Sequence, residues 1–149
     1  EEVQRLVAPA KADPVMIPFP GIANGGSPIL VQGTNDLIRH LWGAENSVFD
    51  LATKTELDSY LCAQAVLSPV SRMVAETADW LAPKLQNPSQ GEAFLRSLIA
   101  SSLAGTPAVT LIDALNTAGG YNQRLRQHME RNGLQTDLRA GLNDLEAST

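Results

Sequence analysis

Apolar residues repeat at helical spacing through most of the chain from Thr53 onward. Such stripes predict helices that each turn one apolar side inward, so each stripe is expected to be core rather than a ligand site. The stripes are Leu57, Tyr60, Leu61 and Ala65; Val70, Met73, Val74, Thr77 and Leu81; Leu95, Leu98, Ile99, Ser102 and Leu103; Ala108, Leu111, Ile112 and Leu115; Leu125 and Met129; and Leu138, Gly141, Leu142 and Leu145.

Capping and breaking residues predict where these helices begin and end. Residues 55–86 are expected to form one long helix or a pair, interrupted at Ser68-Pro69. Ser89, followed three residues later by Glu92, has the spacing of a capping box. The other expected boundaries are an end at Gly105, a start at Thr106-Pro107, a stop at Asn132-Gly133 and a last start at Thr136-Asp137.

The first third of the chain has a different pattern, with short apolar runs bounded by turn residues. Val15–Ile17, Ile29–Val31 and Val48–Leu51 predict three short strands, and Asn35 or Asp36 is expected to cap a short helix that ends at Gly43. Three strands of this length are too few to form a stable sheet alone. They are interpreted as the edge of a larger sheet, and the fold as mainly α.

The composition changes this picture in one respect. The chain has 149 residues, about one domain, with 44% hydrophobic but only 5% aromatic residues. Small apolar residues on the inner helix faces favour close packing, and helices with so little aromatic filler often complete their core against a partner. A homodimer built from the helices of residues 53–115 is therefore expected.

Charge and chemistry exclude several functions. The 11 Lys+Arg against 16 Asp+Glu give a net charge of −5 without a basic patch, so no nucleic-acid partner is expected. Neither His40 nor His128 has metal-ligand spacing, and the lone Cys62 is interpreted as a buried, inert thiol rather than a reactive one. The sequence has no long apolar segment and no signal peptide, so no membrane partner is expected and the cytoplasm is the default location. Because the chain begins without Met and reads like the end of a helix, it is expected to be a fragment of a longer polypeptide.

Motifs of self-contained enzymes are absent from the sequence. It has no Gly-x-Gly-x-x-Gly after a strand, no phosphate-binding loop and no Gly-x-Ser-x-Gly. The one unusual stretch is Leu115–Leu125, LNTAGGYNQRL, where two adjacent glycines join two predicted helices. Gly119 and Gly120 permit close approach to backbone N–H groups beside a helix expected to start near Asn122, which favours an anion site. The alternative is a helix C-cap followed by an N-cap.

The same loop carries a resemblance to a known family. Asn116–Asn122, NTAGGYN, resembles the Thr/Ser-Ser-Pro-Gly-Gly-Thr-Thr loop of pyrroline-5-carboxylate reductases. Weaker matches are Ala12–Pro20 and Gly25–Gln32, which resemble the late strands of the family's nucleotide-binding domain, with Ile17-Pro18 at its Met-Pro. Further weak matches are Glu56–Asp58, Leu103–Gly105, Gly133 and the stripe 138–145.

The resemblance implies a domain organisation. Residues 1–52 would be the incomplete C-terminal end of a Rossmann-type NAD(P)-binding domain, and 53–149 a helical dimerisation and substrate domain like the C-terminal domain of 6-phosphogluconate dehydrogenase. The full-length protein would be an NAD(P)-dependent oxidoreductase of proline biosynthesis, inactive as this chain alone. Since the dinucleotide motif is absent, this chain alone is not expected to bind NAD(P)H.

The resemblance also implies site residues. A small carboxylate substrate would be bound by residues of the double-glycine loop: Thr117, Gly119, Gly120, Tyr121 and Asn122. Asn122 would take the catalytic position and Pro18 would lie at the cofactor. The chain departs from the family where Asn122 replaces the loop's last threonine and Ala118 its proline. A Gly-Ser-Gly-Pro-Ala segment is replaced by CAQAVLSP and a terminal Arg-Ser pair is missing, so the substrate need not be pyrroline-5-carboxylate. The alternative functions are a non-catalytic helical dimerisation module and a small-molecule-binding module.

Overall fold

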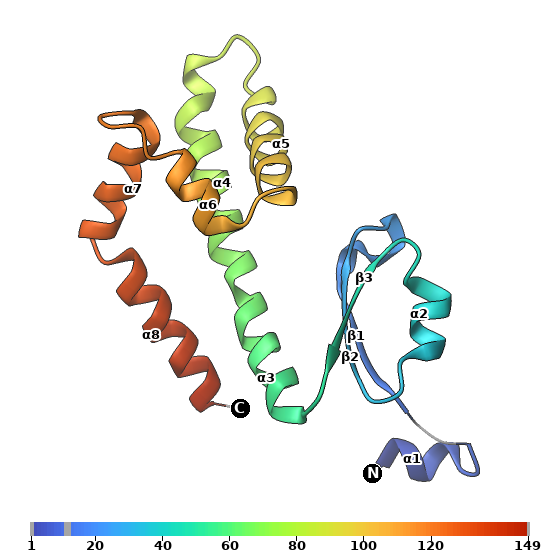
Figure 1. Ribbon diagram of the computed structural model, residues 1–149. Helices are drawn as coiled ribbons and strands as arrows, with labels where there is room; N and C mark the ends of the chain where they lie inside the picture. Colours follow the sequence, from blue (N-terminus) through green and yellow to red (C-terminus); the bar gives the residue numbers. More distant parts are fainter. Residues whose placement is uncertain (1, 11–12, 149) are drawn as a thin grey trace. The chain divides into compact units, whose positions relative to one another are not determined.

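The computed structural model describes residues 2–10 and 13–148, which form two compact units. The first ends at Cys62 and the second comprises Ala63–Ser148. The mainly α fold expected from the sequence is confirmed, with a helical part that follows a few short strands (Figure 1). The unit boundary lies ten residues after the expected domain boundary at 52/53, because Leu57 of the first long helix packs on the sheet.

The first unit contains the three predicted strands. Its elements are α1 (Glu2–Val7), β1 (Val15–Pro18), the 3-10 turn η1 (Pro20–Asn24), β2 (Pro28–Gln32), α2 (Asp36–Trp42), β3 (Ser47–Leu51) and α3 (Lys54–Ala63). The sheet order is β1-β2-β3, with β1 antiparallel and β3 parallel to β2. The register pairs Leu30 with Ile17 on one side and with Phe49 on the other.

The centre of this unit is β2. Successive strand residues point to opposite faces, yet Ile29, Leu30 and Val31 are all buried, so both faces of β2 are covered. Leu30 contacts Leu51 and Leu57, which places the start of α3 over one face of the sheet. Helix α3 up to Cys62 thus belongs to the strand unit.

Polar contacts fix the elements around β2. The Ser27 N–H donates to the Asn46 side chain, which ties the start of β2 to the start of β3. Asn35 and Arg39 of the α2 region both donate to Asp50 on β3. These two hydrogen bonds, with Arg39 the larger cause, hold the pKa of Asp50 below its usual range. Asn35 is the N-cap of α2 as expected, but its side chain bonds Asp50 instead of capping the helix.

The second unit is helical throughout its regular structure. Its elements are η2 (Gln64–Val66), α4 (Leu67–Leu81), η3 (Ala82–Lys84), α5 (Gln90–Ala104), α6 (Ala108–Ala114), α7 (Tyr121–Arg131) and α8 (Leu134–Ala147). The expected interruption of the first long helix is the 3-10 turn η2, which puts Pro69 in the first turn of α4, where proline is tolerated. Gly91 of α5 packs against Leu81 and Leu85, where a Cβ would make ordinary van der Waals contacts at 3.5 and 3.4 Å.

Three boundary predictions are wrong in detail. The Ser89 hydroxyl donates to the Asn87 side chain, so it does not form the expected capping box with Glu92. Helix α8 starts at Leu134, two residues before Thr136, because Gly133 adopts a positive φ of 96° and serves as its N-cap. Likewise α6 starts at Ala108 with Pro107 as N-cap.

The helical stripes are not a closed core. In the described part of Ala63–Ser148, Gly91 is the only fully buried residue, whereas large apolar side chains such as Leu98, Leu103 and Ile112 are about half exposed. Within the described part of this unit the stripes are thus only partly covered. Within the described ranges no single helix is long and apolar enough to cross a membrane. The pair α5 and α6, bent by 114°, meets that criterion together by length and composition alone.

Candidate functional site

The double glycine forms a tight turn between α6 and α7. The Gly120 N–H donates to the Thr117 carbonyl at 2.9 Å, which closes a four-residue turn. Gly119, the third residue of that turn, has a φ of 74°, a conformation that L-residues avoid. Gly120 is extended and is the N-cap of α7, and Arg124 N–H makes the first helical bond to its carbonyl. Gly119 is thus required by the turn itself.

Helix α7 begins at Tyr121, one residue before the expected start near Asn122. Asn122 therefore lies in the first helical turn and does not cap the helix. The exposed Asn122 side chain makes no hydrogen bond to any described residue, so it is available to a ligand. Tyr121 is 91% exposed, and Thr117 and Gly119 are also exposed.

The backbone donors of the loop are divided into two groups. The N–H groups of Gly119 and Gly120 are used inside the turn, by Gln123 Oε1 at 2.8 Å and by the Thr117 carbonyl. The next three N–H groups, those of Tyr121, Asn122 and Gln123, have no acceptor among the described residues. These three belong to the first turn of α7, at the positive end of the helix dipole. The arrangement can bind a carboxylate or another small anion there.

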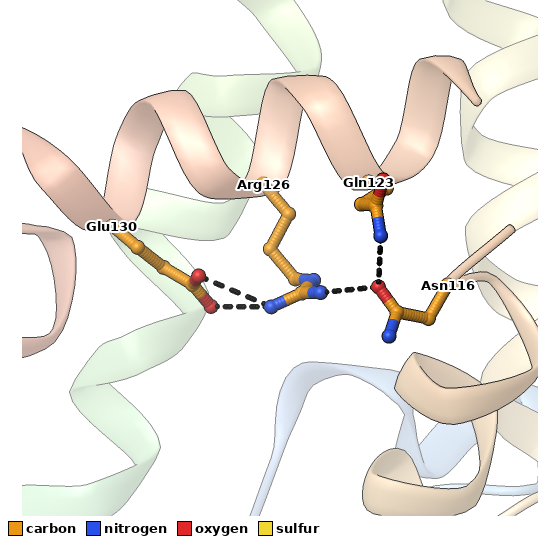
Figure 2. A network of polar contacts seen from close by, with 4 residues as sticks. All are labelled: Asn116, Gln123, Arg126 and Glu130. Atoms are coloured by element: carbon orange, nitrogen blue, oxygen red, sulfur yellow. Dashed lines mark hydrogen bonds and ion pairs between the residues drawn. The ribbon is translucent and has the colours of Figure 1, made fainter. Parts of the chain in front are cut away.

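A network of polar side chains connects the double-glycine turn to helix α7 (Figure 2). The Asn116 side-chain oxygen accepts from Gln123 Nε2 at 3.1 Å and from Arg126 at 2.7 Å. Arg126 in turn pairs with both carboxylate oxygens of Glu130, at 2.9 and 3.1 Å. Asn116 comes from the loop after α6, and the other three side chains come from α7. Together with the Gly119–Gln123 bond, they connect the third turn of α7 to the double glycine.

Two hollows adjoin α7. A polar one of about 490 Å³ lies along its exposed side, lined by Tyr121, Arg124, Gln127, His128 and Arg131. An apolar groove of about 840 Å³ lies between α4, α7 and α8, lined by side chains such as Val70, Met73, Met129, Leu138 and Leu142. Among the residues described, no group of three or more His, Cys, Asp or Glu residues could hold a metal ion.

Of the residues predicted from the sequence, Thr117, Gly119, Gly120, Tyr121 and Asn122 lie together at the start of α7. Pro18 lies in the other unit, at the exposed end of β1 opposite Ile29. The sequence analysis did not predict that Gln123 and Arg126 contact this loop. Arg126 and Glu130 do have the four-residue spacing of a helical ion pair, but nothing in the sequence links them to Asn116 across the loop.

Comparison with known proteins gives the fold but not the family. No protein-family model and no curated protein matches the sequence. Among solved structures, the pyrroline carboxylate reductase of Plasmodium falciparum with NADP bound matches 99% of this chain, with a TM-score of 0.76 and 9% identity. The pyrroline-5-carboxylate reductase of Coxiella burnetii matches 98%, with a TM-score of 0.78 and 9% identity. The enzyme of Streptococcus pyogenes matches 91%, with a TM-score of 0.73 and 14% identity.

The match covers only part of each of these proteins. It includes 63%, 59% and 57% of their respective lengths, so this chain spans about three fifths of a reductase. Sequence identity this low supports no transfer of activity or of site residues. What the similarity shows is that this chain has the fold of part of a pyrroline-5-carboxylate reductase.

Proposed function

We propose that this chain is the C-terminal part of a pyrroline-5-carboxylate reductase-like, NAD(P)-dependent oxidoreductase, in which it contributes the dimer interface and the loop that binds the substrate carboxylate. The observation that carries the proposal is the start of α7. There, three backbone N–H groups that have no acceptor among the described residues follow a double-glycine turn, in a chain with the fold of part of such a reductase.

In this proposal the chain binds and orients a small carboxylate. A helix start favours a negative group by roughly 0.3–1 kcal/mol when exposed, and several charge-assisted hydrogen bonds add to that. The Asn122 amide is a neutral donor beside the bound group. It cannot supply a hydroxyl proton, so turnover of pyrroline-5-carboxylate is expected to be weak.

The residues of this chain do not form a dinucleotide site on their own. In the described ranges no glycine-rich turn connects one of the strands to a following helix, and α2 starts after Asn35 rather than at such a turn. A nicotinamide cofactor would supply the hydride in the full-length protein, with Pro18 at its edge. Calorimetric titration of this chain with NADPH should therefore show no binding. Micromolar affinity would contradict the proposal that the rest of the full-length protein binds the cofactor.

The substrate loop can be tested with two glycine variants of the full-length protein. A Cβ at Gly120 would lie 3.0 Å from the Thr117 carbonyl oxygen, so Gly120→Val crowds the turn and the approach to the α7 start. It should abolish NADPH oxidation with pyrroline-5-carboxylate. Gly105→Val is the control, because a Cβ there meets nothing within 4 Å. Equal activity of both variants would move the site elsewhere, and Asn122→Thr should raise activity if the loop is correctly assigned.

The apolar groove between α4, α7 and α8 favours a second candidate, a helical module that binds a partner chain without catalysis. The two functions differ in one measurement. A full-length reductase binds NADPH in equilibrium dialysis, whereas a non-catalytic dimerisation or small-molecule-binding module does not.

A further inference from the structure

We infer that the side chains of Gln123 and Arg126 are positioning groups, which set the geometry of the anion site through Asn116 and Gly119 without themselves touching the ligand. The inference rests on the proposed carboxylate site at the start of α7. It concerns the network of Figure 2, in which each side chain fixes the orientation of the next.

Each contact in the network, from Glu130 to Gly119, sets the orientation of the next side chain. Glu130 holds the Arg126 guanidinium with two contacts, and Arg126 then donates to the Asn116 side-chain oxygen. Because that oxygen also accepts from Gln123 Nε2, the Gln123 carboxamide is oriented with its own oxygen toward the Gly119 N–H. Reversal of either amide would replace a donor–acceptor pair with two like groups.

The contact at Gly119 decides which backbone groups a ligand meets. With its N–H bound by Gln123 and that of Gly120 bound by Thr117, the glycines shape the turn but offer no donors. The donors left for an anion are the N–H groups of Tyr121, Asn122 and Gln123, all of them on the rigid first turn of α7. Without the network, the turn before them would be held by the single Thr117–Gly120 bond.

The charge balance fits a positioning role. Arg126 is only 31% exposed and its charge is paired with Glu130, so it adds no free cation to the site. Its contact with Asn116 is therefore structural rather than a direct attraction of the ligand.

The test is an NMR titration of the full chain with L-proline as the carboxylate probe, following the amides of Tyr121, Asn122 and Gln123. Arg126→Met and Gln123→Met should each weaken binding about three- to tenfold, the effect of one lost hydrogen bond. Both should lower the order parameters of residues 117–120 without ligand. Arg96→Met is the matched control, since it removes the same charge and a helical ion pair, that with Glu92, but lies on α5 outside the network.

Gln123→Glu separates positioning from fold stability. A carboxylate at this place favours the helix start, so thermal stability should hold or rise, while repulsion of the probe and loss of the bond to Asn116 should weaken binding. The outcomes are distinct. No shift of these amides in the wild type overturns the proposed site. Wild-type binding that Arg126→Met and Gln123→Met leave unchanged, or that Arg96→Met weakens equally, overturns only the positioning role.

Discussion

The two units of this chain bury their apolar residues in opposite ways. The strand unit places three consecutive residues, Ile29, Leu30 and Val31, at 3% exposure or less. The helical unit is larger, yet leaves Phe94 at 59% and Leu103 at 53% exposed, and Gly91 is the only residue buried among those described in it. The strand unit therefore has a buried centre of its own, whereas the described helices leave their apolar faces largely exposed.

The largest expected effect tests the centre of the strand unit. Ile29→Ala removes a side chain with 0% exposure and should cost about 2–5 kcal/mol, from lost burial and the cavity left behind. Val15→Ala on β1, where the side chain is 51% exposed, is the control and should cost far less. Urea unfolding followed by circular dichroism measures both. Similar losses would mean that the sheet has no distinct core.

The next effect tests whether the helical unit is covered by a second copy. If it is, the wild type is a dimer and Phe94→Glu should weaken it by at least about tenfold, as charges at a buried interface position do. Leu37→Glu introduces the same charge on α2 of the strand unit and should leave the dimer intact. Sedimentation equilibrium distinguishes the two. A monomeric, stable wild type would contradict the homodimer.

A smaller effect measures local stability within the helical unit. Gly133→Ala forces a side chain into a φ of 96° and should cost about 1–2 kcal/mol. Gly141→Ala lies inside α8 with open space around its Cβ, so it should gain about 0.5–1 kcal/mol from helix propensity. Thermal unfolding of the two variants should therefore shift in opposite directions. A common direction would mean that tertiary contacts, rather than backbone preference, dominate at these positions.

The smallest effect is the pH dependence of the strand unit. Since the folded pKa of Asp50 is lowered by Arg39 and Asn35, its contribution is present above the usual aspartate range and is lost as the pH falls toward the lowered pKa. Asp50→Asn should make the urea midpoint of unfolding less dependent on pH over that acid range. Asp79→Asn, on α4, should leave the pH dependence of the midpoint unchanged. The exposed ion pair keeps the expected change small.

The strands and most helix boundaries were predictable because they depend on local patterns. The three apolar runs became β1, β2 and β3, and Gly105 and Asn132 end helices where expected. Local reasoning failed where two polar partners compete. Ser89 bonds Asn87 instead of the helix. At the start of α3, by contrast, the Glu56 N–H donates to the Thr53 hydroxyl and the Glu56 carboxylate accepts from the Ala52 N–H, and the sequence analysis identified neither bond.

The site was only partly predictable for a related reason. The double glycine marked the turn, but the positive φ falls on Gly119 alone and the helix start on Tyr121. The contact of Asn116 with Arg126 crosses the turn, so it depends on the turn geometry rather than on spacing along a helix. For the same reason, the use of the Gly119 N–H by Gln123 could not be foreseen.

The parallel pairing of β3 has a practical consequence for handling the chain. Within the described residues β3 bonds only to β2, so its outer edge presents a row of backbone donors and acceptors beside the 44% exposed Phe49. Such an edge is a template for further strands and promotes aggregation. Asp50 of β3 forms an exposed ion pair with Arg39, and a charged group on an edge strand discourages stacking of identical chains. The chain should therefore stay dispersed best where Asp50 remains ionised, and concentrated acidic solutions should drive it toward fibrous or amorphous precipitates.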